Sequence, residues 1–205
     1  MKKAKWGGEQ PQDPNQVQII NDAGNANGVN FDFLENRMFF YSDINEMSIL
    51  QFNRKLREMG GALLAKSIYL EIPTIPMYLH INSPGGSIFD GLSAMDEIIN
   101  CKVPVISIVD GISASAATFL SVVAHKRLIK KHSFMLIHQL SSAHWGTYEN
   151  FSDEKQNLDK LMGVIKSVYK NYSKIPVKVI SEILKHDLYL DSKECLQYGL
   201  VDEII

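Results

Sequence analysis

The sequence predicts an α/β protein with a parallel sheet, and three observations favour this fold class. Short apolar runs rich in β-branched residues alternate with segments whose apolar residues recur every three or four positions. Glycines or other small residues stand between these runs and the helices that follow them. The chain has 205 residues and is 45% hydrophobic, which suffices for one domain with one core.

The first 30 residues differ in composition from the rest. They are rich in Gln, Asn, Gly, Asp and Pro and contain few large apolar residues. The burial that such a segment can offer does not offset the entropy lost on ordering it. We therefore expect residues 1–30 to form a flexible arm and residues 31–205 to form the folded domain.

The domain is predicted to begin with a strand at 37–41 and a helix capped by Asp43. One buried face of this helix is marked by residues at three- and four-residue spacing: Ile49, Phe52, Leu56 and Met59. The pattern leaves open whether the helix continues past Gly60. Two prolines end any helix before the next strand, at 77–81.

A glycine turn follows this second strand and opens an amphipathic helix at 88–99. Gly85 and Gly86 in that turn allow one backbone to approach another and can direct an N–H into a cleft, although an ordinary turn is also compatible with them. The next strand, 103–109, is expected to stop at Asp110.

Ser115 comes next, where we expect a helix to begin before its apolar part at 119–124. Free N–H groups and the helix dipole at such a position favour a nucleophilic serine and its oxyanion. A serine that merely caps the helix is the simpler alternative.

A third strand, 133–137, leads directly into His138. Taken alone, His138 could be a hydrogen-bonded core histidine. Because parallel strands deliver their carboxyl ends to one edge of a sheet, however, Gly86, Ser115 and His138 are expected to meet there. Their coincidence favours a catalytic site.

The remaining segments are predicted to be mainly helical. A long amphipathic helix covers about 153–172, a short one has Pro176 in its first turn, and a last one, 192–198, precedes a strand at 200–204. Cys101 and Cys195 have no metal-ligand spacing, so we interpret them as buried small hydrophobic residues.

Charge and hydropathy exclude several classes of function. The net charge of −2 gives no reason to expect nucleic-acid or membrane binding. The basic pairs at 126–127 and 130–131 are interpreted as a solvated turn. No apolar run is long enough to span a membrane, and the first residues lack the apolar core of a signal peptide. We therefore expect a soluble, cytoplasmic protein.

Four motifs occur in the order and rough spacing of one known family. They are Ile-Asn-Ser-Pro-Gly-Gly-Ser (81–87), Gly-Ile-Ser-Ala-Ser-Ala-Ala (111–117), Phe-Met-Leu-Ile-His-Gln (134–139) and Asp-Leu-Tyr-Leu-Asp-Ser-Lys-Glu-Cys-Leu-Gln-Tyr-Gly-Leu-Val-Asp (187–202). Over about residues 36–205 the chain resembles ClpP, the proteolytic subunit of the caseinolytic Clp protease.

The resemblance implies a Ser-His-Asp triad in which Ser115 is the nucleophile, His138 the general base and Asp187 the third member. It also implies that the backbone N–H groups of Gly86 and Ala116 stabilise the oxyanion. Spacing alone could not distinguish Asp187 from the other nearby carboxylates.

The resemblance further implies the ClpP/crotonase-like superhelix of ββα units, with a projecting strand-helix handle at about 143–172. Its strand would lie near 145–151. Homo-oligomeric heptameric rings would stack as a tetradecamer around a chamber that receives unfolded polypeptides. ATP would be used by a separate hexameric AAA+ unfoldase, the Clp ATPase, and the subunit itself would need no cofactor or metal. Tyr78 matches an apolar docking position for that ATPase, and His80 replaces an aromatic residue there.

The sequence departs from the family pattern at several points. Leu140 stands where a proline is usual, and His186 replaces an arginine. The N-terminal segment does not match the family's axial loop, and the segment before Met77 is longer.

The leading interpretation is a serine endopeptidase subunit of an ATP-dependent protease. A catalytically idle or regulatory ring subunit is the alternative. A third interpretation, an acyl-CoA hydratase or isomerase, follows from the fold shared with crotonase enzymes, because fold alone does not set function.

Overall fold

The computed structural model describes residues 36–205, so the predicted N-terminal arm lies outside the described residues. Within them a parallel sheet of six strands runs in the order β1-β2-β3-β4-β6, and β5 pairs with the far end of β3. The strands are β1 (Arg37–Phe40), β2 (Met77–Ser83), β3 (Val105–Ala114), β4 (Lys126–Ile129), β5 (Phe134–Leu136) and β6 (Glu203–Ile204). The expected α/β class with a parallel sheet is therefore confirmed.

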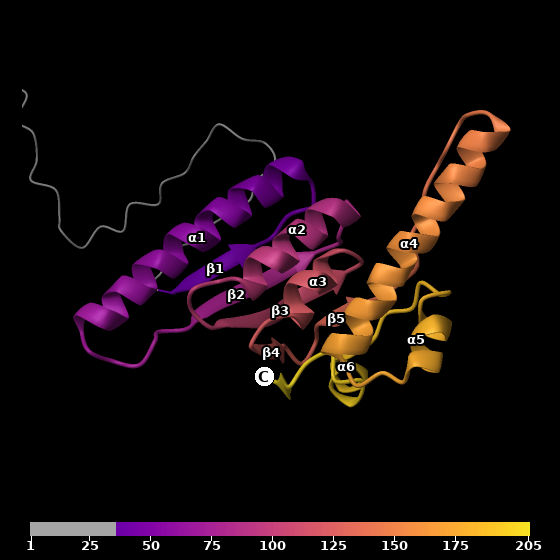
Figure 1. Ribbon diagram of the computed structural model, residues 1–205. Helices are drawn as coiled ribbons and strands as arrows, with labels where there is room; N and C mark the ends of the chain where they lie inside the picture. Colours follow the sequence, from indigo (N-terminus) through magenta and orange to yellow (C-terminus); the bar gives the residue numbers. More distant parts are fainter. Residues whose placement is uncertain (1–35) are drawn as a thin grey trace, which may run out of the picture.

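Helices join the strands and cover the sheet (Figure 1). They are α1 (Glu46–Tyr69), α2 (Ile88–Ile99), α3 (Ala117–Val122), α4 (Tyr148–Tyr172), α5 (Val177–Ile183) and α6 (Ser192–Gln197). The core contains apolar residues of β1, β2 and β3 together with the buried faces of α1, α2 and α3.

The first helix differs from the prediction at its start. Asn45, not Asp43, caps α1: its side chain accepts the N–H of Ser48, whose hydroxyl in turn accepts the N–H of Asn45. The hydroxyl of Ser48 also donates to the carbonyl of Asp43, which therefore lies outside the cap.

The sequence left open whether the first helix continues past Gly60, and the structure shows that it does. The helix α1 continues through Gly60 to Tyr69. A Cβ on Gly60 would lie 3.1 Å from Sγ of Cys101, so the glycine allows α1 to approach the loop between α2 and β3.

The strand β3, expected over 103–109, does not stop at Asp110 but continues to Ala114. Two polar contacts explain why a turn signal is overridden here. The carboxylate of Asp110 has partners from neighbouring strands, and the Oδ1 of Asn82 accepts the N–H of Ile112 at a bulge in β2. The extension of β3 is the part that pairs with β5.

The handle prediction is correct for the helix and wrong for the strand. In Figure 1 the first half of α4 projects away from the sheet, and only Ile165, Val168 and Tyr169 of this helix are buried. The strand expected near 145–151 is not formed: residues 138–147 contain no strand, and residues 148–151 already belong to α4. A strand needs a neighbour to satisfy its backbone groups, and this segment has none in the described part of one copy.

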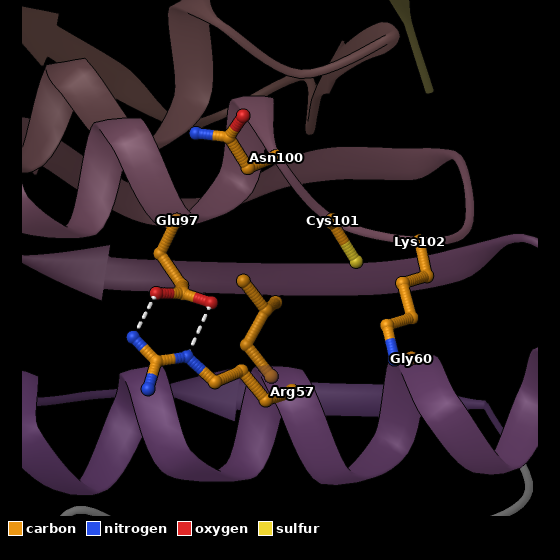
Figure 2. Close-up of a pocket in the computed structure, with 7 residues that line it drawn as sticks. Arg57, Gly60, Glu97, Asn100, Cys101 and Lys102 are labelled. Atoms are coloured by element: carbon orange, nitrogen blue, oxygen red, sulfur yellow. Dashed lines mark hydrogen bonds and ion pairs between the residues drawn. The ribbon is translucent and has the colours of Figure 1, made fainter.

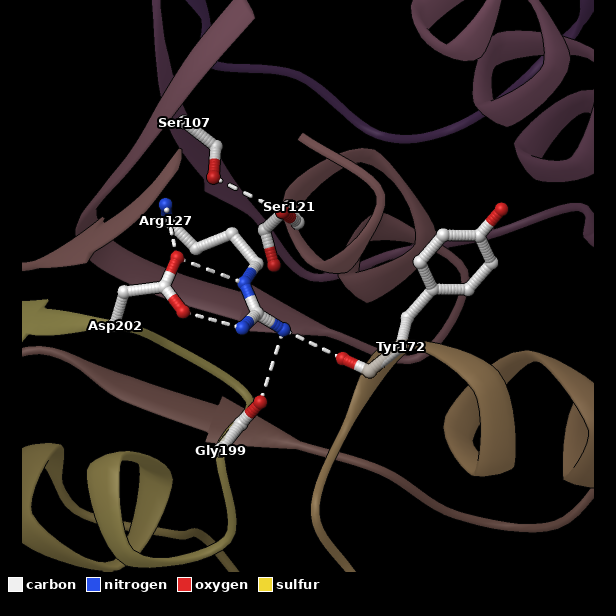
Figure 3. Close-up of polar contacts among 6 residues, drawn as sticks. All are labelled: Ser107, Ser121, Arg127, Tyr172, Gly199 and Asp202. Carbon is white, nitrogen blue, oxygen red and sulfur yellow. Dashed lines mark hydrogen bonds and ion pairs between the residues drawn. The ribbon is translucent and has the colours of Figure 1, made fainter. Parts of the chain in front are cut away.

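The basic pair at 126–127 lies in β4, which corrects the predicted solvated turn. The guanidinium of Arg127 forms a two-point ion pair with Asp202 and donates to the carbonyls of Tyr172 and Gly199 (Figure 3). Arg127 therefore ties β4 to the end of α4 and to the C-terminal segment.

Candidate active site

Ser115 follows the last residue of β3 and has a φ of +52°, a conformation that non-glycine residues rarely adopt. Such a residue costs of order 1–3 kcal/mol and persists only where its surroundings fix it. Its N–H donates to the carbonyl of Leu136, at 2.8 Å, and its carbonyl accepts the N–H of Thr118. The turn between β3 and α3 thus holds Ser115 in a strained position, just before the six-residue helix rather than within it.

The glycine turn after β2 lies directly against this serine. A Cβ on Gly85 would lie 2.7 Å from the Cβ of Ser115 and 2.5 Å from the carbonyl oxygen of Ala114, so only glycine fits. Gly85 and Gly86 both have positive φ. The two motifs that the sequence marks on separate strands are therefore neighbours in space.

The direction of the Gly86 N–H follows from a bridge to Ile44. The N–H of Ile44 donates to Gly85, and the carbonyl of Ile44 accepts from Ser87. In parallel pairing a residue bonds to the two neighbours of its partner, so the N–H of Gly86 points away from Ile44. The sequence gives no signal for this role of Ile44, because only its backbone N–H and carbonyl take part.

His138 lies two residues beyond Leu136, the end of β5, and contacts Asp187, the expected third member of the triad. Its Nδ1 lies 2.9 Å from Oδ1 of Asp187. Because a carboxylate accepts, the Nδ1 carries a proton, and in the neutral imidazole this leaves Nε2 as the acceptor. The His138 side chain is 26% exposed and that of Asp187 is 78% exposed in the single chain.

The predicted site residues therefore fall into two groups. Gly86, Ser115 and Ala116 gather at the ends of β2 and β3, while His138 and Asp187 form a pair beside β5. Within the described residues no hydrogen bond joins the Ser115 hydroxyl to His138, which is common before a substrate tightens a catalytic site.

A cavity of about 280 Å³ lies elsewhere, between α1 and α2 (Figure 2). Its lining includes Arg57 and Glu97, which form a two-point ion pair, and Cys101. Cys195 is buried as predicted, but Cys101 is only partly so, because it borders this cavity. Burial still raises the pKa of the Cys101 thiol, so this cysteine is a poor nucleophile.

Within residues 36–205 no three His, Cys, Asp or Glu side chains lie close enough together to hold a metal ion. That the subunit uses no cofactor stays a prediction. No helix in the same residues combines the length and hydropathy that a membrane span requires.

A polar cluster that sequence reasoning missed surrounds Asp110. The Oδ2 of Asp110 lies 2.8 Å from Nδ1 of His80 and accepts the Tyr41 hydroxyl, and Lys130 lies 2.9 Å from Oδ1. The Nε2 of His80 accepts from Arg37, at 2.9 Å. A single carboxylate within an apolar strand is the sequence signal that could have revealed it.

This cluster occupies the positions where the resemblance implied an apolar docking pocket. His80 is 7% exposed and stacks on Phe39, and the guanidinium of Arg37 lies 5.0 Å from the ring centroid of Tyr78. The surroundings of Tyr78 and His80 therefore combine aromatic rings with charged and polar partners, where the resemblance implies an apolar pocket.

Comparison with known proteins agrees with this architecture. The Clp protease family model matches residues 35–205. A chloroplastic ATP-dependent Clp protease proteolytic subunit 1 from Arabidopsis thaliana is 34% identical over 150 residues, which is 71% of this chain and 76% of the relative. Proteolytic subunits from Epifagus virginiana and Chaetosphaeridium globosum are 33% and 30% identical over the same length, 71% of this chain and 76% and 75% of those relatives.

Among solved structures, a ClpP1 mutant from Listeria monocytogenes superposes with a TM-score of 0.72 at 22% identity, over 83% of this chain and 91% of that chain. This likeness supports the fold, and the family model and the curated relatives support the assignment. The chain is thus a member of the Clp protease family, with the ClpP fold and the sequence of a proteolytic subunit.

Proposed function

We propose that the chain is a serine endopeptidase subunit that cleaves unfolded polypeptides with Ser115, His138 and Asp187. The strained Ser115, held between the glycine turn and β5, is the observation that carries the proposal. Strain of this kind at a turn fits a nucleophile better than it fits a helix cap, since a cap needs no positive φ.

The roles follow from the positions of the donors and acceptors. The Nε2 of His138 accepts the Ser115 proton as Oγ attacks a peptide carbonyl, and Asp187 stabilises the imidazolium through Nδ1. The N–H groups of Gly86 and Ala116 receive the oxyanion, where loss of one donor typically lowers the rate by about 10²–10³. His138 then protonates the leaving amine, and water hydrolyses the acyl-enzyme.

The proposal extends to stacked heptameric rings enclosing a chamber, fed by a separate AAA+ unfoldase. Large apolar side chains on and beside the projecting half of α4 support a role in assembly: Trp145 is 97% exposed and Tyr148 is 83% exposed. Surface of that kind is usually covered by another chain.

An idle ring subunit is the competing function, and one experiment separates the two. Hydrolysis of short fluorogenic peptides is measured for the purified protein and for Ser115→Ala, with particle mass recorded on the same samples. Activity that disappears in the variant, at unchanged mass, supports the peptidase. An assembled wild-type particle without activity, alone and with a Clp ATPase, would overturn it.

A further inference from the structure

A chain of two buried hydroxyl groups joins the turn at Ser115 to the handle helix. Thr118 of α3 and Tyr169 of α4 are 0% and 1% exposed. The Oγ1 of Thr118 lies 2.6 Å from the carbonyl oxygen of Ser115 and 2.7 Å from the hydroxyl of Tyr169. The Thr118 N–H reaches the same carbonyl at 3.0 Å.

The direction of these hydrogen bonds is fixed by counting protons. A threonine hydroxyl has one hydrogen, and the carbonyl of Ser115 can only accept it. Tyr169 must therefore donate to Thr118, and its burial keeps it protonated because burial raises the pKa of the phenol. The series of hydrogen bonds therefore runs from Tyr169 through Thr118 to Ser115. In a site without water, consecutive hydrogen bonds of this kind strengthen one another.

The carbonyl that receives this chain belongs to the same peptide unit as the N–H of Ala116. Because that unit is planar and trans, holding the oxygen also sets the direction of the N–H, which points the opposite way. We propose that Thr118 and Tyr169 are positioning residues for peptide hydrolysis, which aim the Ala116 N–H at the oxyanion. This inference rests on the proposed peptidase function.

The hydrogen bond from Thr118 matters because few other contacts in the described residues fix the peptide unit between Ser115 and Ala116. The helix α3 has six residues and no side-chain cap. Beyond the Thr118 hydroxyl, the described chain offers the Ser115 carbonyl only the Thr118 N–H, at the first turn of this short helix. Without the hydroxyl the peptide unit can rotate, and the donor then meets the transition state poorly while ground-state binding of the substrate is little changed.

The test compares Thr118→Val, Thr118→Ser and Tyr169→Phe with wild type on a fluorogenic peptide. We expect Thr118→Val to lower kcat by about tenfold to a hundredfold at unchanged KM, since small misplacements of catalytic groups have effects of this size. Tyr169→Phe should lower kcat less, and Thr118→Ser should restore most of the activity. A peptide boronate, which mimics the tetrahedral state, should lose affinity in parallel with kcat/KM.

Two matched controls remove a hydroxyl from the same helices but leave both hydroxyl groups that lead to Ser115 in place. Tyr172→Phe alters α4, and Ser121→Ala removes a buried hydroxyl from α3 that bonds the carbonyl of Thr118. Both should retain kcat, even if Ser121→Ala lowers the melting temperature.

The outcomes distinguish the two levels of inference. Wild type without Ser115-dependent activity would overturn the peptidase itself. Active wild type with unchanged kcat in Thr118→Val, or equal losses of kcat in that variant and Ser121→Ala at equal loss of stability, would overturn only the positioning role.

Discussion

At the residue scale, the candidate site depends on how Asp187 meets His138. The carboxylate is mostly exposed in the single chain, while the imidazole is largely covered. Exposed ion pairs contribute little to stability, so the role proposed for Asp187 is to fix the His138 tautomer rather than to hold the fold together.

Replacing Asp187 by Asn should therefore lower activity without destabilising the protein. An asparagine can donate its amide to Nδ1 and stabilise the wrong tautomer, and such a change lowers kcat by about 10²–10⁴. Peptide hydrolysis and thermal unfolding are measured together. Asp153→Asn, which changes another exposed carboxylate, should leave both unchanged; a loss of stability in Asp187→Asn would contradict this role.

The buried carboxylate of Asp110 behaves differently. Burial alone would raise its pKa, but hydrogen bonds from His80, Tyr41 and Lys130 outweigh this effect and lower the pKa from 3.8 to about 2. A folded pKa below the unfolded value stabilises the protein above the unfolded pKa, and this contribution is lost as the pH falls toward 2.

We expect Asp110→Asn to lower the free energy of unfolding by about 2 kcal/mol at pH 7, from 1.36 kcal/mol for each unit of pKa. Denaturant unfolding at pH 7 and pH 3 should show the difference from wild type shrinking by about half at the lower pH. Asp159→Asn, which breaks an exposed pair with Lys155, is the control and should cost less than about 0.5 kcal/mol at either pH. A difference for Asp110→Asn that does not depend on pH would exclude the carboxylate as its cause.

At the scale of elements, the sequence predicts strand and helix types well and their ends less well. The spacing of Ile49, Phe52 and Leu56 indicates α1, because apolar periodicity records one buried face. The continuation of β3 past Asp110 could not be read from the sequence, since the partners of that carboxylate lie on other strands. The same limit applies to Thr118 and Tyr169, whose contact joins elements 51 residues apart in the sequence.

Replacing Gly61 of α1 and Gly86 of the turn after β2 by alanine should change the stability of the fold in opposite directions. A Cβ on Gly86 would lie 2.1 Å from the carbonyl oxygen of Ile44, at a φ of +146°, whereas a Cβ on Gly61 meets nothing within 4 Å. Gly61→Ala should stabilise the fold by about 0.5–1 kcal/mol, and Gly86→Ala should lower the melting temperature and abolish hydrolysis. Thermal unfolding checks both; a neutral Gly86→Ala would contradict the close approach of Ile44.

The junction at Arg127 is also an element-scale feature. Arg127→Met removes an ion pair and leaves the carbonyls of Tyr172 and Gly199 without their donor, which should cost about 2–4 kcal/mol. Hydrogen exchange should quicken in residues 199–205. Lys126→Met breaks only an exposed pair with Glu203 and should cost less than about 1 kcal/mol; equal effects of the two variants would disprove the junction.

At the scale of the whole molecule, the described chain combines a folded sheet domain with a helix that leaves it. Nothing in the described part of one copy covers the apolar surface around Tyr148. Family membership supports its burial between copies. The sequence motifs identify the domain, whereas the number of subunits in an assembly depends on surfaces that follow no short sequence pattern.

We expect Tyr148→Asp combined with Phe151→Asp to reduce particle mass while each chain remains folded. Assembly would bury the two new charges against a second copy, and the apolar contacts that remain there cannot offset the free-energy cost of burying them. Light scattering measures mass and circular dichroism measures helix content. Lys155→Asp on the same helix is the control; an unchanged mass in the double variant would exclude this part of α4 from assembly.

The attachment of α4 has one more consequence. Its buried residues begin near its C-terminal end, at Ile165, so the preceding turns make few contacts with their own domain. Substitutions there, and even insertion of whole helical turns, can accumulate without disturbing the fold or the turn that holds Ser115. Duplicated genes could therefore diverge in which chains assemble together while both copies keep the same folded peptidase domain.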